Sequence, residues 1–384
     1  MNEQRGDTEV PFADEPIADE PIADEPITRE PITHEPVTGE EPSLADLARR
    51  LLAVDTGGWT PDVVKALSDA LGWARGGTAD HPVLVTGRSS GDARLRPVGT
   101  YEQRYASGES YVELAVPVAT AAPDAAAQAA AFRAAREELT SALGRPSVMG
   151  SHGDMGPFYD SGPLWGAPFV RWRGMPDTLE LRAGKAGPEL VLQPTDPAEN
   201  WFWRQGSGEE HALSGFFGSD NDPANAGLGF PGGWRARSWE TVTRSLGDFL
   251  ETLPAEAVAL GTGFGMPFYG RTGEGAPLLF DVACGDDRLA IGCFAPDGVD
   301  AAALGWGTVA EHPGTASVWR DDDPLWRVDA GGPGEPKGRA LAEMLVATAR
   351  ASGVTEPAGL IVGGEAEYVD GYHVRYYGLG LPTG

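Results

Sequence analysis

The chain has 384 residues and a formal net charge of −28 at neutral pH. Hydrophobic residues make up 41% of the chain and aromatic residues 9%. This is enough for a sizeable core and excludes a protein that is disordered over its whole length. The acidic balance argues against nucleic-acid and anionic-membrane partners, and no stretch approaches the ~20 apolar residues of a membrane span.

The first 42 residues are predicted to be a disordered tail. A five-residue repeat ending in Glu-Pro runs from Phe12 to Pro36, a last variant ends at Pro42, and residues 1–42 carry a net charge of −11. Proline at every fifth position prevents a helix, and the glutamate before each proline is held extended. The tail is either a spacer or a multivalent docking segment. It lacks the basic and apolar regions of an export signal.

Residues 43–194 are predicted to form a first α+β lobe. Ser43 should cap a helix over LADLARRLL, and Thr60-Pro61 should begin a second helix that ends at Gly72. A third helix is expected from about Asp124 to Leu143. Alternating patterns predict six strands, at 81–87, 93–98, 110–119, 168–174, 177–184 and 188–194. The apolar side chains expected on one buried face of the last two are Leu179, Leu181, Leu190 and Leu192.

A Gly-, Asn- and Asp-rich connection is predicted over 195–237, followed by a second α+β lobe over 238–384. Ser238 should cap a helix over 239–253, and a further helix over 339–350 should be ended by Gly353. Strands are expected at 257–261, 277–283, 288–294, 359–363 and 372–381. The amphipathic helix patterns that follow Trp59 and Trp239 are similar to each other. The similarity indicates either that one α+β unit was duplicated or that two amphipathic helices agree by coincidence. The sequence predicts two lobes of short antiparallel sheets packed with helices.

The two cysteines are predicted to be reduced core residues on one hairpin. The pattern FDVACGDDRLAIGCF turns at Asp286-Asp287, which places Phe280 opposite Cys293 and Cys284 opposite Leu289. The two sulfurs are then about four residues apart along the ladder, too far for the ~5.5 Å Cα separation of a disulfide. Reduced core cysteines favour a cytoplasmic protein.

Residues 43–194 resemble a family of actinobacterial proteins of unknown function. The similarity follows the order LADLARRLL, GWTPDVVKALSDALGW, LGRPS, PFVRWRG and TLELRAG. It depends on packing residues: Gly72, Trp73, Leu143, Gly144, Arg145, Pro146, Arg171, Trp172, Leu179 and Leu181. Members often lie among genes of specialised secretion and toxin–immunity systems, so the resemblance implies an interaction role. It implies no active site.

No motif in the sequence predicts a cofactor or a metal. The motifs HExxH, CxxC and G-x-S-x-G are absent. Glycines 261, 263 and 265 do not match the G-x-G-x-x-G spacing of a dinucleotide site, and no helix is expected directly after them, so they are expected to form a flexible turn. Ser151, His152 and Asp154 have the residue types of a catalytic triad. Residues so close in sequence rarely converge on one reacting atom.

Large aromatic residues gather in the predicted connection. The candidate partner-binding residues are Trp201, Phe202, Trp203, Phe216, Phe217, Phe230 and Trp234. Aromatic side chains in Gly-rich loops are enriched where proteins bind partners, and packing between the lobes is the alternative interpretation.

The leading hypothesis is a non-enzymatic module, immunity-like or adaptor-like, that binds another protein. The acidic body, with a net charge of −17 outside the tail, favours a basic partner. One alternative is a hydrolase whose site is assembled between the lobes from residues such as His152, Glu210, His211 and Asp220. The other is a structural or cargo component that docks through its repeat tail. The sequence fixes neither the partner nor the oligomeric state.

Overall fold

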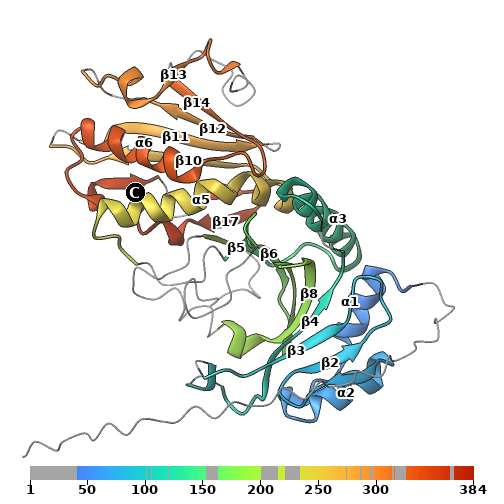
Figure 1. The fold of residues 1–384 in the computed structure, drawn as a ribbon. Helices are drawn as coiled ribbons and strands as arrows, with labels where there is room; N and C mark the ends of the chain where they lie inside the picture. Colours follow the sequence, from blue (N-terminus) through green and yellow to red (C-terminus); the bar gives the residue numbers. More distant parts are fainter. Residues whose placement is uncertain are drawn as a thin grey trace, which may run out of the picture. The chain divides into compact units, whose positions relative to one another are not determined.

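The computed structural model describes residues 41–100, 102–104, 106–120, 122–152, 163–199, 215–220, 234–273, 275–285, 288–294, 296, 298–313, 315, 326–363 and 367–384. Two antiparallel sheets and five helices of nine or more residues make up the regular structure of these ranges, so the predicted α+β class is confirmed (Figure 1). The predicted disordered tail lies outside the described residues, apart from its last two positions. None of the helices in these ranges is both long and apolar enough to cross a membrane.

The first sheet has eleven strands in the described residues, in the order β1-β2-β3-β4-β8-β7-β6-β5-β9-β17-β16. Their bounds are β1 Ala74–Gly77, β2 Pro82–Val85, β3 Ala93–Pro97, β4 Tyr111–Pro117, β5 Val148–Ser151, β6 Pro168–Trp172, β7 Asp177–Gly184, β8 Gly187–Pro194, β9 Phe216–Ser219, β16 Glu367–Val369 and β17 Tyr372–Arg375. The six strands predicted in residues 43–194 are all present. Strands β1, β5, β9 and β16 were not predicted, because their sequences ARGG, VMGS, FFGS and EYV do not alternate apolar with polar residues.

The second sheet has six strands in the order β13-β14-β12-β11-β10-β15. Their bounds are β10 Phe264–Gly270, β11 Leu278–Gly285, β12 Arg288–Cys293, β13 Gly307–Thr308, β14 Trp326–Gly331 and β15 Leu360–Val362. The hairpin of β11 and β12 has the predicted register, with Phe280 opposite Cys293 and Cys284 opposite Leu289. Both cysteines are buried thiols outside any disulfide, in agreement with the prediction made from this register.

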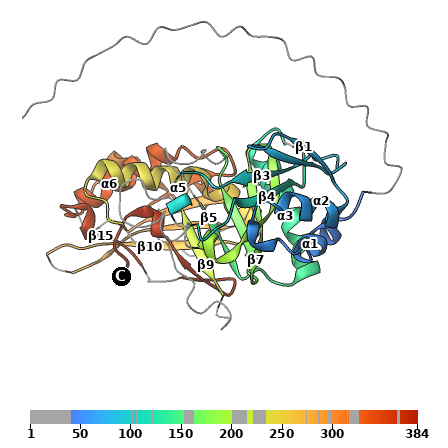
Figure 2. The same cartoon turned by 90° about the horizontal axis from the view of Figure 1, so that it is seen from below.

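The helices lie on one face of each sheet. They are α1 Leu44–Leu52, α2 Val63–Leu71, α3 Ala125–Leu143, α5 Trp239–Leu260 and α6 Gly338–Ala351. Helices α1 and α3 pack on β7 and β8 of the first sheet, and α5 and α6 pack on β11 of the second (Figures 1 and 2). Helix α5 also contacts α3 and β6, so one helix bridges the two sheets. Its N-cap Ser238 and the N-cap Ser43 of α1 are as predicted, and Asp124, near the predicted start of the third helix, caps α3.

Two helix boundaries differ from the predictions. Helix α2 begins at Val63 rather than at Thr60-Pro61, because a 3₁₀ turn at Gly57–Trp59 precedes it and leaves Thr60 extended. The side chain of Trp59 is buried there, and its indole N–H donates to Asp177 at 2.7 Å. The strand predicted at 257–261 is instead the end of α5. A short apolar run cannot be distinguished from a buried helix turn by its periodicity.

The glycine-rich segment after α5 is divided between two elements. Gly261 ends the helix in the left-handed conformation, with φ 60°, and strand β10 begins at Phe264 and includes Gly265. The interpretation of residues 261–265 as one turn is therefore corrected. Hydrogen bonds from β10 to both β11 and β15 hold this segment inside the second sheet.

The C-terminal segment contributes to both sheets. Strand β15 pairs with β10 in the second sheet, whereas β17 pairs with β9 and extends the first sheet. Residues 40–384 together form one compact unit. The boundaries predicted at 194 and 238, and the duplication of one unit, stay predictions.

Helices α5 and α6 approach each other closely at two glycines. A Cβ atom on Gly338 would overlap the carbonyl oxygen of Gly247 and lie 2.8 Å from the backbone nitrogen of Glu251. The carboxylate of Glu251 accepts the N–H of Gly338 and so satisfies one free donor at the start of α6. The absence of side chains at 247 and 338 is what permits this crossing.

Candidate functional site

The two faces of the first sheet differ in chemistry. Leu179 and Leu181 of β7 and Leu190 and Leu192 of β8 have no exposed surface and face the helices, as predicted. The opposite face of the same strands is mainly charged or polar, with Thr178, Glu180 and Arg182 on β7 and Glu189 and Gln193 on β8 beside the apolar Val191. Because side chains alternate across a strand, these residues form a polar face on the opposite side of the sheet. That face is also buried, since Glu113, Glu180 and Gln193 are each less than 9% exposed.

Opposite charges on this polar face stand directly across from each other. The ladder pairs Arg96 with Glu113, Arg171 with Glu180, and Arg182 with Glu189. The guanidinium of Arg182 also spans to β4, where its two Nη atoms lie 2.7 and 2.8 Å from the carboxylate oxygens of Glu113. Cross-strand pairing of opposite charges stabilises a sheet, and the bidentate geometry fixes both side chains.

The pKa of Glu113 shows how strongly Arg182 stabilises the ionised carboxylate. Burial by itself would raise the pKa, but Arg182 and Arg96 outweigh it and lower the pKa to about 2. Burial would likewise raise the pKa of Glu180, and Arg171 together with His152 holds it well below its usual range. Both carboxyl groups are therefore ionised at neutral pH and serve as fixed negative charges.

His152 lies at the end of β5, beside this network. Its ring stacks on Phe169 at 4.3 Å between centroids, and its Nε2 is 4.0 Å from Glu180. Burial lowers the pKa of His152, against the opposing effect of Glu180. The imidazole is consequently neutral at pH 7.

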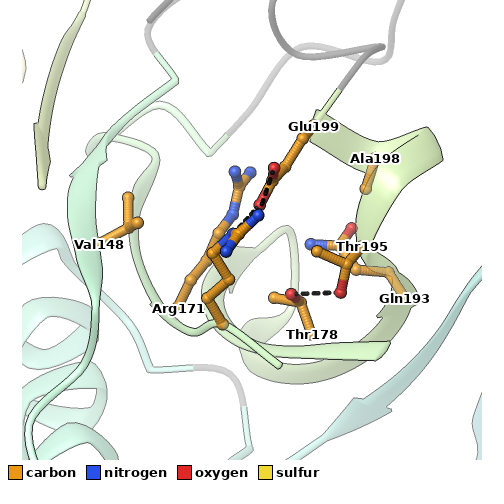
Figure 3. Close-up of a pocket in the computed structure, with 8 residues that line it drawn as sticks. Val148, Arg171, Thr178, Gln193, Thr195, Ala198 and Glu199 are labelled. Atoms are coloured by element: carbon orange, nitrogen blue, oxygen red, sulfur yellow. Dashed lines mark hydrogen bonds and ion pairs between the residues drawn. The ribbon is translucent and has the colours of Figure 1, made fainter. Parts of the chain in front are cut away.

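A small pocket lies at the edge of the polar face, between β6, β7 and β8 (Figure 3). The hydroxyls of Thr178 and Thr195 lie 2.9 Å apart on one side of it. Arg173 holds the carboxylate of Glu199 through contacts of 2.5 and 3.2 Å on the other side. Its cavity volume of about 10 Å³ accommodates about one water molecule, so an organic substrate does not fit here.

We expect acid to destabilise the protein through Glu113. The folded-state pKa of about 2 lies below the ordinary 4.5, so the stability from its ionised form is complete above pH 4.5 and is lost as the pH falls toward 2. At ~1.4 kcal/mol per pKa unit this loss is about 3 kcal/mol. Urea unfolding of the wild type and of Glu113→Gln between pH 6 and 2 measures it. Glu343→Gln, at an exposed ion pair on α6, is the control and should keep the wild-type pH dependence. Equal slopes for wild type and Glu113→Gln would contradict the assignment.

The predicted aromatic surface is only partly described. Phe216, Phe217 and Trp234 are at most 3% exposed, and Phe216 contacts Phe249 and Phe264 in the core. These three residues therefore pack the interior and present no surface to a partner. Strand β9 brings the two phenylalanines inside because it pairs with β5 and β17 on both sides. The other four, Trp201, Phe202, Trp203 and Phe230, lie outside the described residues.

The residues of the predicted hydrolase site do not converge where they are described. His152 follows the end of β5, whereas the backbone N–H of Asp220 donates to Ser147 at the other end of that strand. Five residues of extended chain separate these two points by about 16 Å. Glu210 and His211 lie outside the described residues.

An open groove of about 790 Å³ lies between the start of α3, the middle of α5 and the β7–β8 turn. Leu164 stands on its edge with 97% of its surface exposed, and the half-buried Trp165 follows it. Pro123 and Pro163 add apolar surface, and the carboxylates of Asp124 and Glu251 and the ammonium of Lys185 add charge. We call this feature the Leu164 groove.

The sequence by itself shows neither the Leu164 groove nor the burial of the polar face. A Leu-Trp pair between Pro163 and Gly166 is a signal for an apolar turn, but it does not say that the turn is exposed. The alternation of Glu113, Glu180 and Arg182 with leucines indicated strands with one polar face. It did not say that this face is buried.

Comparisons of the chain with family models, with curated proteins and with solved structures yield no match, so function has to be inferred from the geometry of the described residues.

Proposed function

We propose that this protein is a non-enzymatic module that binds another protein, and that a basic, partly apolar segment of the partner docks in the Leu164 groove. The observation that carries the proposal is Leu164 itself. Leu164 has 97% of its surface in water and lines the groove together with Trp165, Pro123 and Pro163, and an exposed apolar patch of this kind marks an interaction site. Burying Leu164 contributes roughly 1.5–3 kcal/mol to association.

The apolar part of the groove can hold an aliphatic side chain. Leu164 and Trp165 form the two central positions of a turn that Gly166 closes by donating its N–H to Pro163 at 3.1 Å. The turn presents both side chains on a fixed backbone, which lowers the entropy lost on binding. Trp165 is also partly packed against the core, so it offers a rigid aromatic surface. Such aromatic surfaces are common at the centre of binding sites.

The charged part of the groove favours a cation. Asp124 and Glu251 line it from α3 and α5, and Lys185 is the single basic side chain among the described lining residues. The amide oxygen of Gln128, a residue that lines the groove, is buried and accepts no hydrogen bond from any described residue. The net charge of −17 outside the tail also attracts a basic partner over longer distances and raises the association rate.

This proposal keeps the leading hypothesis and moves its site. The resemblance of residues 43–194 implies an interaction role, and we propose that this role is immunity-like or adaptor-like. Two buried cysteines in the thiol form support a cytoplasmic location for it. The aromatic residues at 201–203 and 230 stay a predicted second contact.

A peptide array tests the proposal directly. Its probes are eight-residue peptides with blocked ends that combine leucine with lysine or arginine, each with a twin in which glutamate replaces every basic residue. We expect the basic peptides to bind and their acidic twins not to bind, as measured by fluorescence anisotropy at low and high salt. Added salt should slow association more than it changes dissociation.

Three variants locate the site. Leu164→Asn should weaken binding of the basic peptides at least tenfold, since about 1.4 kcal/mol is a factor of ten. Asp124→Asn and Glu251→Gln remove charge and keep an oxygen that can accept the helix-capping hydrogen bonds, so they should weaken binding without unfolding the protein. Leu52→Asn, at an exposed leucine of α1, is the control and should bind like the wild type. Unchanged binding by Leu164→Asn, or a preference for acidic twins, would disprove the proposal.

A further inference from the structure

A buried carboxyl group, that of Glu256, contacts the turn that carries Leu164 and Trp165. Directly after the turn, the backbone N–H of Ala167 donates to Oε1 of Glu256 at 3.2 Å. A Cβ atom on Gly166 would lie 2.7 Å from Cγ of Glu256, so the turn rests directly on this side chain. The carbonyl of Ala167 in turn accepts the N–H of His152 at 3.1 Å.

Glu256 lies on α5 and is 1% exposed. Its Oε1 also accepts the hydroxyl of Ser151, at 2.5 Å, from the end of β5. One oxygen therefore connects the helix that bridges the two sheets, a strand of the first sheet and the turn of the Leu164 groove. A change of charge on this carboxyl group acts on all three elements at once.

The groups around Glu256 are almost all neutral. Thr252 on α5 is a further hydrogen-bond partner, and the phenol of Tyr377, which donates to the carbonyl of Ser151 at 3.3 Å, is a titratable group that Glu256 influences. Burial raises the pKa of Tyr377, so its phenol stays protonated at neutral pH; Arg171 opposes that rise and Glu256 adds to it. No lysine or arginine among the described residues forms an ion pair with Glu256. An ionised carboxylate at this position has hydrogen bonds but no counter-ion.

We propose that Glu256 is a proton-linked anchor of the Leu164 groove, so that docking of a basic segment releases a proton from this carboxyl group. The proposal rests on the proposed function and assigns its regulation. It depends on Oε1 of Glu256, which accepts hydrogen bonds from Ser151 and from Ala167 beside the turn. It also depends on the lack of a counter-ion for Glu256 among the described residues.

The direction of the effect follows from electrostatics. Burial raises the pKa of Glu256 to about 7, and the hydrogen bonds from Ser151, Ala167 and Thr252 only partly oppose it. A cation in the groove beside Trp165, whose neighbour Gly166 rests on Glu256, favours the ionised form. By linkage, ionisation of Glu256 must strengthen cation binding by the same factor. A basic segment should therefore bind more tightly as the pH rises from 6 to 8.

The first measurement uses the free protein. The fluorescence of the full chain is recorded from pH 5.5 to 8.5 for the wild type and for Trp165→Phe, and the difference reports on Trp165. We expect a transition with a midpoint near 7 in this difference. It should be absent when the same pair is made in Glu256→Gln, and it should move to higher pH in Ser151→Ala, which loses a hydrogen bond to the carboxylate. If Glu256→Gln fails to fold, the shift in Ser151→Ala is the deciding result. Trp165 fluorescence without this transition overturns the proposal.

The second measurement uses the blocked leucine–lysine peptide, whose charge is constant over this range. Its affinity for the wild type should rise roughly fivefold between pH 6 and 8, the lower limit of typical couplings between two sites, and should not change with pH for Glu256→Gln. A pH-dependent Trp165 signal without binding at either pH overturns the coupling and the proposed function together. Binding that is independent of pH in the wild type overturns the coupling alone and leaves the proposed function standing.

Discussion

Replacing Arg182 by methionine should lower the free energy of unfolding by about 3 kcal/mol, because it leaves the carboxylate of Glu113 buried without its main partner. Breaking one side of a buried ion pair costs 3–5 kcal/mol in general. The lower end applies here because about a quarter of the Arg182 side chain is exposed and Arg96 still lies 3.4 Å from Glu113. Urea unfolding at pH 7 measures the loss.

A double variant separates the charge effect from lost packing. Glu113→Gln combined with Arg182→Met removes the unpaired charge, so its cost should be clearly smaller than the sum of the two single changes. Arg339→Met is the matched control, since its pair with Glu343 is more than half exposed and should contribute little. Strict additivity of the two single variants would show that the pair is not coupled.

Replacing Gly338 by alanine should destabilise the protein by about 2–3 kcal/mol. Intrinsic helix propensity predicts the opposite sign, a gain of at most ~1 kcal/mol for alanine over glycine. The steric effect is larger, because the new methyl group would meet the backbone of Gly247 and Glu251, which cannot move unless α5 and α6 separate. The change in melting temperature and the urea midpoint both report the net effect.

Gly285→Ala provides the comparison for this helix crossing. A Cβ atom at 285 has no neighbour within 4 Å, and Gly285 has no positive φ angle. This variant should therefore unfold like the wild type. A stable Gly338→Ala variant would mean that the α5–α6 contact is looser than the structure shows. Because α5 also carries Glu251 and Glu256, a shift of this helix should weaken peptide binding in the Leu164 groove as well.

The sequence by itself determined the features that depend on neighbours in the chain. Ser43, Asp124 and Ser238 cap helices because each side chain reaches the backbone N–H three residues later. The register of the β11–β12 hairpin follows from a two-residue turn between alternating apolar runs, which also set which way Cys284 and Cys293 point. These are local interactions, so short patterns specify them.

Only the tertiary structure decided which surfaces are buried and which distant residues meet. Strand β9 pairs with β17 more than 150 residues later, and this pairing places Phe216 and Phe217 in the core. The polar face of the sheet carries charges that alternation alone would place in water, and cross-strand arginines and glutamates let it be buried. Glu256 meets Ser151 and Ala167 only because α5 packs across the end of β5. Such contacts depend on how complete elements pack, and the chemistry of a single segment does not contain that information.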